Sequence, residues 1–282
     1  MIGLTAFLRG LGFRAVRPAL YIWFANFFFA LFMYWGYYHL FSGAAGESKI
    51  AADITGETGI FTFLVDIAHN YGDGFSLLIS LALLGILLFL PVSIFTAGGI
   101  YSVLFRDERT TFSNLIASSV ENFFDMFKIF LINIVNWVAA AIIPVILLLA
   151  FTNSETLMHN ETAIRLFTYG WIAITLLLYT FSTAIYDFSR ILRLKEDRNV
   201  FYIFKEAFLF TFANKFNVLM IFLTYTVSLA VLFLVYIVFN HFLENVLFVF
   251  FLFIIYQGFL MTRYFLKIAV MRAEIKLMET TG

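Results

Sequence analysis

The chain has 282 residues, of which 62% are hydrophobic and 13% are charged, with equal numbers of basic and acidic side chains and a mean hydropathy of +0.94. This composition excludes an ordinary soluble domain, because in such domains about a quarter of the residues are charged. The absence of cysteine excludes disulfides, thiolate metal sites, iron–sulfur clusters and a cysteine nucleophile. The class that remains is a polytopic membrane protein.

Six apolar runs are long enough to cross about 30 Å of hydrocarbon, which takes about 18 residues or more in a helix. We therefore expect membrane helices at Ala19–Phe41, Phe75–Phe105, Ile129–Phe151, Ile164–Arg190, Phe216–Asn240 and Val246–Met271. Pro91 and Pro144 lie inside the second and third spans. Each should kink its helix and free a backbone carbonyl.

The basic residues set the expected orientation. With the N-terminus inside, 16 of the 18 Lys and Arg residues fall on one side, and only Lys49 and Arg165 fall on the other. Because cytoplasmic segments are enriched in Lys and Arg, we expect both termini in the cytoplasm.

A charged heptapeptide occurs twice, at Arg106–Phe112 and Lys195–Phe201, in the pattern basic-acid-acid-basic-x-x-Phe. Each copy follows an apolar span and precedes an amphipathic stretch, Phe112–Lys128 or Phe201–Lys215. These stretches are typical of helices that lie in the membrane interface. A partial third copy lies at Arg272–Glu274.

Together with an N-terminal amphipathic stretch at Leu4–Arg17, these copies predict an all-α integral membrane fold with six transmembrane helices. The helices would form three hairpin repeats of parallel orientation, each preceded by a cytoplasmic interfacial amphipathic helix. The chain would be a single membrane domain, residues 1–282, with repeats at 1–105, 106–194 and 195–282.

The run Tyr186-Asp187-Phe188-Ser189-Arg190-Ile191, followed by Lys195-Glu196-Asp197-Arg198 and a surface helix, carries a resemblance. It resembles uncharacterised bacterial six-helix membrane proteins, among them domains of unknown function and the membrane domain found beside some glycerophosphodiester phosphodiesterases. The resemblance covers most of the chain. It implies a location in the bacterial inner membrane, and no catalytic residues can be carried over from it.

The first candidate site is the pair of charged turns, with Arg106, Arg109, Lys195 and Arg198. One interpretation is that they hold anionic lipid headgroups, since each basic residue near a membrane surface contributes about 1 kcal/mol. The other is that they bridge the neighbouring acids and form a structural joint between a span and its surface helix.

The second candidate is an outer-face set of the chain's four histidines, His39, His69, His159 and His241, which fall in or beside the expected outer loops. Neighbouring carboxylates would complete a zinc-type or pH-sensing site. The alternative is chance, because no pair has the spacing of a helical metal-binding doublet. No resident cofactor is expected.

Polar residues inside the spans are the third candidate, and no charged residue lies at an expected span centre. Asn133 and Asn136 should hydrogen-bond between helices or line a polar pocket. The small residues of Ser93–Gly99 favour close helix packing, with a hinge beside Pro91 as the alternative. The 39 phenylalanines are consistent either with the hydrophobic environment of a membrane or with an aromatic cavity that binds a lipophilic molecule.

No catalytic motif is present, and we expect the protein not to be an enzyme. The first functional hypothesis is a non-catalytic accessory or scaffold subunit that packs against partner membrane proteins or lipid. The alternative is a permease or carrier for a lipophilic or amphipathic substrate. Expected partners are membrane lipid and either other membrane subunits or a second copy of the chain, with no nucleic acid.

Overall fold

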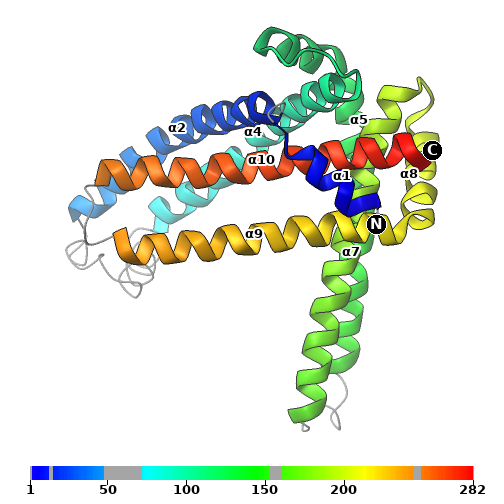
Figure 1. The fold of residues 1–282 in the computed structure, drawn as a ribbon. Helices are drawn as coiled ribbons and strands as arrows, with labels where there is room; N and C mark the ends of the chain where they lie inside the picture. The colour runs from blue at the N-terminus through cyan, green and yellow to red at the C-terminus, as the bar shows by residue number, and fades with distance from the viewer. Residues whose placement is uncertain (1, 13–14, 48–71, 153–160, 244–248, 282) are drawn as a thin grey trace. The chain divides into compact units, whose positions relative to one another are not determined.

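The structure is a computed structural model that describes residues 2–12, 15–47, 72–152, 161–243 and 249–281. Within these ranges the chain is helical and has no strand. The helices are α1 (Ile2–Gly10), α2 (Val16–Glu47), α4 (Gly72–Phe105), α5 (Phe112–Thr152), α7 (Glu161–Lys195), α8 (Val200–Ala213), α9 (Lys215–Leu243) and α10 (Val249–Thr281) (Figure 1).

Six of these helices, α2, α4, α5, α7, α9 and α10, are long and apolar enough to span a membrane. The prediction of an all-helical chain with six spanning helices is confirmed. The protein is therefore a multi-pass membrane protein.

The predicted surface stretches fold in two different ways. Residues 112–128, expected as a helix separate from the span, run without a break into that span, so that α5 has 41 residues. Nothing at Lys128 or Ile129 stops a helix, because neither Pro, Gly nor a capping side chain occurs there. The second stretch does form a separate helix, α8, which ends at Ala213 because the next residue, Asn214, has φ −104° and ψ 23°, outside the helical range. The side-chain amide of Asn214 donates to the carbonyl of Phe210 at 3.2 Å.

The described chain divides into two compact units. One is the α2–α4 hairpin, residues 23–93, in which Phe29 of α2 packs against Phe89 of α4 with ring centroids 5.2 Å apart. The other, larger unit contains residues 1–22 and 94–282.

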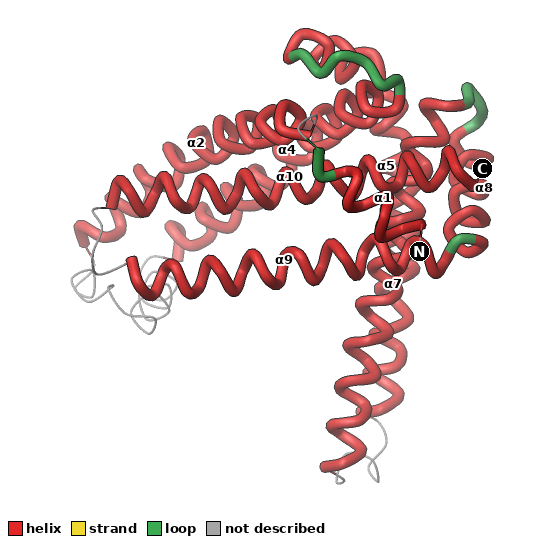
Figure 2. Tube along the Cα trace, viewed as in Figure 1, coloured by secondary structure: helices red, strands yellow, loops and turns green. Residues whose placement is uncertain are grey.

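The core of the larger unit lies at one end of its long helices. We call this end the base; it comprises residues 2–12, 15–22, 94–130, 184–222 and 264–281. Its fully buried side chains include Phe7, Tyr101, Leu115, Phe188, Ile203 and Ala269. The loops 106–111 and 196–199, drawn in green in Figure 2, also belong to it. Beyond the base, the α5–α7 and α9–α10 hairpins extend as pairs of helices (Figure 1).

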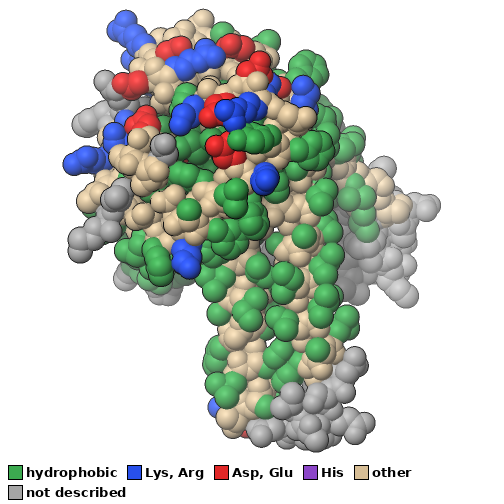
Figure 3. Space-filling view, turned by 90° about the vertical axis from the view of Figure 1, so that its right-hand side faces the viewer, with side chains coloured by type: hydrophobic (Ala, Val, Ile, Leu, Met, Phe, Trp, Pro, Cys, Tyr) green, Lys and Arg blue, Asp and Glu red, His purple; other side chains and the backbone are tan. Residues whose placement is uncertain are grey.

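Side-chain chemistry follows this division. On the face in Figure 3, Lys, Arg, Asp and Glu side chains gather over the base, and hydrophobic side chains cover the projecting hairpin. The hairpins are held internally by aromatic contacts, such as the stacked rings of Phe151 and Phe167 with centroids 3.8 Å apart. The indole N–H of Trp171 also donates to the carbonyl of Pro144 at 2.9 Å.

Helix α1 lies against α9 and α10. A Cβ on Gly3 would come within 2.6 Å of the carbonyl oxygen of Asn217, and one on Gly10 within 2.7 Å of the carbonyl oxygen of Ala269. The two glycines therefore let the backbone of α1 approach its neighbours closely. Ala6 and Phe7 are buried in the same interface.

Candidate functional site

Polar side chains from three helices meet inside the base and form what we call the ionic cluster. Its members are two tyrosines and four charged residues: Tyr101 of α4, Tyr186, Asp187 and Arg190 of α7, and Lys267 and Glu274 of α10.

Arg190 is the centre of the α7 part of the cluster. Its Nη1 donates to Oδ1 of Asp187 at 3.1 Å, one helical turn away, and its Nη2 donates to the hydroxyl of Tyr186. The guanidinium carbon also lies 3.6 Å from the ring centroid of Tyr186 and 5.7 Å from that of Tyr101. The helical spacing of these α7 residues places them on one face, and the cation–π contacts add to the attraction.

The α10 part of the cluster joins α4 and α7. The hydroxyl of Tyr101 donates to Oε2 of Glu274 at 3.1 Å. The Nζ of Lys267 lies 3.9 Å from Oδ2 of Asp187, an ion pair without a hydrogen bond. The cluster thus contains two basic and two acidic side chains on α7 and α10, and Tyr101 connects them to α4.

Burial makes the cluster energetically important. The exposed fractions are 1% for Asp187, 6% for Arg190 and 0% for Glu274. Removing charges from water is unfavourable, and only good pairing offsets it. The pairing is incomplete, because Oε1 of Glu274 and Nε of Arg190 have no hydrogen-bond partner among the described residues. Glu274 can accept one further donor.

The cluster lacks the features of a catalytic centre. Its groups hold one another rather than converge on an open position, and its hydroxyls belong to tyrosines that bond a carboxylate or a guanidinium. Chemically, the arrangement can fix α4, α7 and α10 together and can exchange a proton or a hydrogen bond at Glu274.

The two charged turns differ although their sequences align. In the first, Asp107 has a left-handed backbone (φ 48°), and the amide of Glu108 donates to the carbonyl of Val103 at 3.2 Å. This pattern is a Schellman motif. In the second, Asn199 caps α8 by accepting from the amide of Phe201 at 3.0 Å, and no left-handed residue occurs in it.

The predicted turn residues lie at the surface of the base. Arg106 pairs with Glu121 of α5 at 3.2 Å. Arg198 pairs with Glu196 at 3.0 Å and lies over the ring of Tyr202. Arg109 and Lys195 are exposed, and Arg109 lines a cavity described below.

Arg193, which the sequence patterns did not single out, makes the most bonds in the second turn. Its Nη2 contacts Asp125 of α5 at 3.0 Å and Asp197 at 2.9 Å. Its Nη1 donates to the carbonyl of Arg198 at 2.7 Å. This guanidinium thereby ties α5, α7 and the loop before α8 together.

The in-span asparagines join α5 to α7. Nδ2 of Asn136 donates to Oδ1 of Asn133 at 3.0 Å and to the carbonyl of Ser182 at 3.3 Å. Asn133 is fully buried. Farther along this hairpin, a cavity of about 430 Å³ lies between Trp137, Pro144, Thr175 and Tyr179.

The small-residue stretch of α4 packs closely against α5. A Cβ on Gly99 would lie 2.4 Å from the carbonyl oxygen of Leu115 and would overlap Oγ of Ser119. Gly98 faces the side chain of Met126. The two glycines therefore lie in the α4–α5 helix crossing.

The histidine set falls outside the side chains that the structure describes. His69 and His159 lie in undescribed segments, and only the backbones of His39 and His241 are described, in α2 and α9. Among the described residues, no group of three His, Cys, Asp or Glu side chains is placed to hold a metal ion.

The sequence patterns do not indicate the ionic cluster, because a charged residue in a span signals a functional site when it lies near the span centre. Asp187 and Glu274 lie toward the ends of α7 and α10. One usable signal is present: Asp187 and Arg190 stand three residues apart among apolar and small neighbours. Their contact with Tyr101 and Glu274 is visible only in three dimensions.

Comparison with known proteins adds no relative. No protein-family model, curated protein or solved structure matches the chain. The resemblance to six-helix bacterial membrane proteins therefore stays an expectation.

Proposed function

We propose that the protein is a non-catalytic accessory or scaffold subunit of a bacterial inner-membrane assembly, which packs against partner membrane proteins or lipid. The base is the stable support, and the hairpins are the docking elements. Protein partners would be other membrane subunits or a second copy of the chain.

One observation carries this proposal: the projecting hairpins expose apolar side chains along their length while the core lies at one end. On α7, Tyr169, Leu176 and Tyr179 fall on one helical stripe and are 69%, 60% and 65% exposed. Val135, Val138 and Ile146 form a similar exposed stripe on α5. In a membrane, only lipid tails or another apolar protein surface cover such faces.

The proposal includes the repeat organisation and the topology. Each hairpin would be one repeat of the same orientation, with Phe201–Ala213 and the N-terminal helix at the membrane interface and both termini in the cytoplasm. Support comes from the base, where the two charged turns and the described ends of the chain lie together. This placement agrees with the distribution of Lys and Arg in the sequence.

Photo-cross-linking from α7 tests the scaffold proposal. We expect p-benzoylphenylalanine at Tyr169 and at Leu176 to capture the same protein in native membranes, and mild-detergent purification to recover that protein with the chain. The control position is Ser113, which is exposed in the base, and it should not capture this partner. A monodisperse monomer whose adducts are all lipids would contradict the proposal that the chain is a subunit of a protein assembly.

A second candidate is a carrier for a lipophilic or amphipathic substrate. It is favoured by a groove of about 480 Å³ between α9 and α10, whose wall includes Tyr236, Tyr256 and Phe259 with Arg263 among the lining residues. An apolar groove with one fixed charge fits an amphipathic anion. Its test is the flux of a fluorescent fatty acid into proteoliposomes.

In that assay, Leu232→Trp should fill the groove and reduce the flux at least about tenfold. The matched control is Leu223→Trp, an exposed position on α9 outside the groove. Equal flux through wild type, both variants and empty liposomes would exclude the carrier.

A further inference from the structure

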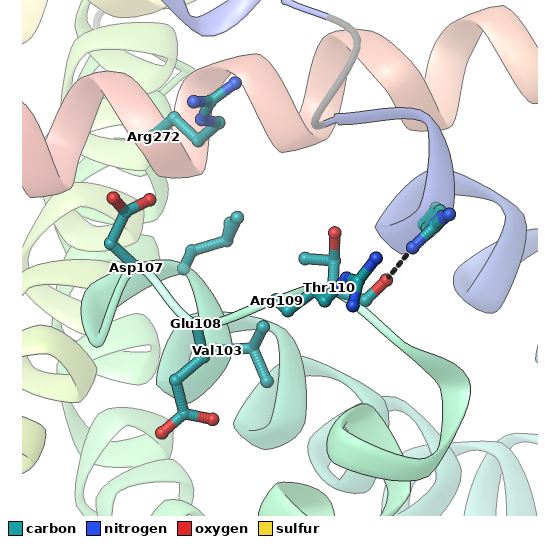
Figure 4. A pocket seen from close by; sticks show the side chains of 8 residues that line it. Val103, Asp107, Glu108, Arg109, Thr110 and Arg272 are labelled. Atoms are coloured by element: carbon teal, nitrogen blue, oxygen red, sulfur yellow. Dashed lines mark hydrogen bonds between the residues drawn. The ribbon is translucent and has the colours of Figure 1, made fainter.

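A cavity of about 500 Å³ lies in the base between the end of α4, the loop that follows it and α10 (Figure 4). Val103 and Leu104 contribute apolar wall. The polar lining includes three arginines, which are Arg17 from the start of α2, Arg109 from the loop and Arg272 from α10, together with Asp107, Glu108 and Thr110 of the loop. We call it the arginine cavity. Its volume is in the range of small-molecule sites, about 300–1,000 Å³.

Backbone contacts hold two of the three arginines in place. Nη1 of Arg17 donates to the carbonyl of Thr110 at 3.1 Å, the dashed line in Figure 4. Nη1 of Arg272 donates to the carbonyl of Gly10 at 3.2 Å. An arginine has five N–H donors, so the bond of Arg17 to the carbonyl of Thr110 leaves donors of that side chain that can reach a ligand. The guanidinium groups are therefore positioned before any ligand binds.

The carboxylates around the arginine cavity do not cancel its charge. Glu108 points away from Arg272 in Figure 4, and it lies 3.9 Å from Arg106, which does not line the cavity. Asp107 points toward Arg272. Asp107 and Glu108 both line the cavity, so its three guanidinium groups stand against two carboxylates, which leaves one positive charge in excess.

We propose that the arginine cavity binds a phosphate-bearing anion. Planar guanidinium forks match phosphate oxygens with paired hydrogen bonds, and arginines from three separate segments can surround one such group. The phosphate comes from a lipid headgroup or from a soluble molecule, because both present the same chemistry. This inference does not depend on the scaffold proposal, since it needs no partner subunit.

The test compares charge variants of the full chain in nanodiscs and in detergent. The lipid probe is phosphatidylglycerol in phosphatidylcholine nanodiscs, counted by native mass spectrometry. The soluble probes are glycerol phosphate and inorganic phosphate, titrated by calorimetry. Near a membrane, each basic residue changes the binding constant about fivefold. We expect Arg109→Gln to weaken binding about fivefold and Arg109→Gln with Arg272→Gln about thirtyfold.

Two further single variants test the inference independently if the double variant folds poorly. Asp107→Asn removes the inward carboxylate and should strengthen binding about fivefold. Arg198→Gln is the matched control, because it removes the same charge from the other turn, outside the cavity, and should change binding less than about twofold. Selective binding of phosphatidylglycerol supports a headgroup site, and binding of the soluble probes supports a soluble phosphate. Absence of binding by every probe, or equal effects of Arg198→Gln and Arg109→Gln, would overturn the inference.

Discussion

Asp107 holds the left-handed conformation at which the chain leaves α4 and enters the loop toward α5. A Cβ in this conformation is strained by about 1–2 kcal/mol, and glycine avoids that strain. Asp is tolerated because its short polar side chain can bond locally. The residue therefore combines backbone geometry with a carboxylate that lines the arginine cavity.

At this position, Asp107→Gly should be more stable than Asp107→Ala by about 1 kcal/mol, since the two variants lose the same carboxylate and differ in one methyl group. At Asp197 of the other turn, whose backbone is not left-handed, the order should reverse by about 0.4–1 kcal/mol, because alanine restricts the unfolded chain. Unfolding in sodium dodecyl sulfate measures both differences. The same order at both positions would be evidence against the left-handed turn.

The two heptapeptides show that similar charge patterns do not predict similar turns. Their charges align at Arg106 and Lys195, yet six residues separate α4 from α5 and four separate α7 from α8. The turn type depends on one left-handed residue and on the capping residues Thr111 and Asn199. Charge patterns carry no information about these backbone angles.

At the scale of elements, α1 depends on close contact with α10. Gly10→Ala should lower the free energy of unfolding by about 1–3 kcal/mol, because the added methyl meets the rigid backbone of Ala269. Gly12→Ala is the control: its nearest atom outside its own turn is the side-chain Nη1 of Arg272 at 3.6 Å, and its effect should stay within about 0.5 kcal/mol. Amide exchange in α1 should accelerate only in Gly10→Ala. Equal exchange in the two variants would contradict this packing.

The ionic cluster makes a second prediction about elements. Arg190→Met should lower the free energy of unfolding by about 3–5 kcal/mol, because it leaves Asp187 buried without its closest partner. Adding Asp187→Asn to that variant should recover part of the loss, giving a coupling energy of about 1–3 kcal/mol. A detergent-unfolding double-mutant cycle measures this coupling.

The exposed pair of Arg165 and Glu161, with side chains 74% and 88% exposed, is the control for that cycle. Its Arg165→Met variant should change stability by less than about 1 kcal/mol. Additive effects of the two substitutions at Asp187 and Arg190 would show that their ion pair does not stabilise the base.

Helix boundaries were predictable where the sequence contains a physical stop. The expected spans at Phe75–Phe105 and Phe216–Asn240 lie within three residues of α4 and α9 at both ends. The expected boundary at Lys128 is wrong, because a change from amphipathic to apolar composition does not interrupt backbone hydrogen bonding. The ionic cluster was not predictable, since its members are separated by up to 173 residues.

At the scale of the whole molecule, the native absence of cysteine permits a direct test of topology. A single cysteine at Arg109, Arg198 or Lys276 should react in intact cells only with membrane-permeant maleimides. One at Glu161, the first residue of α7, should react with impermeant maleimides. The reverse pattern would invert the proposed orientation, and labelling of all four positions from outside would contradict the six-span arrangement.

The contact between α1 and α10 has a consequence for biosynthesis. The side chain of Arg272 donates to the backbone carbonyl of Gly10, which lies 262 residues earlier in the chain. Helix α1 leaves the ribosome long before α9 and α10 exist, and domains generally fold as their chain emerges. The N-terminal segment must therefore wait, without its native partners, until the last hairpin has been made. Closure of the base is then the final step of folding, and a nascent chain released before α10 lacks the part of the α1 contact surface that Ala269 and Arg272 supply.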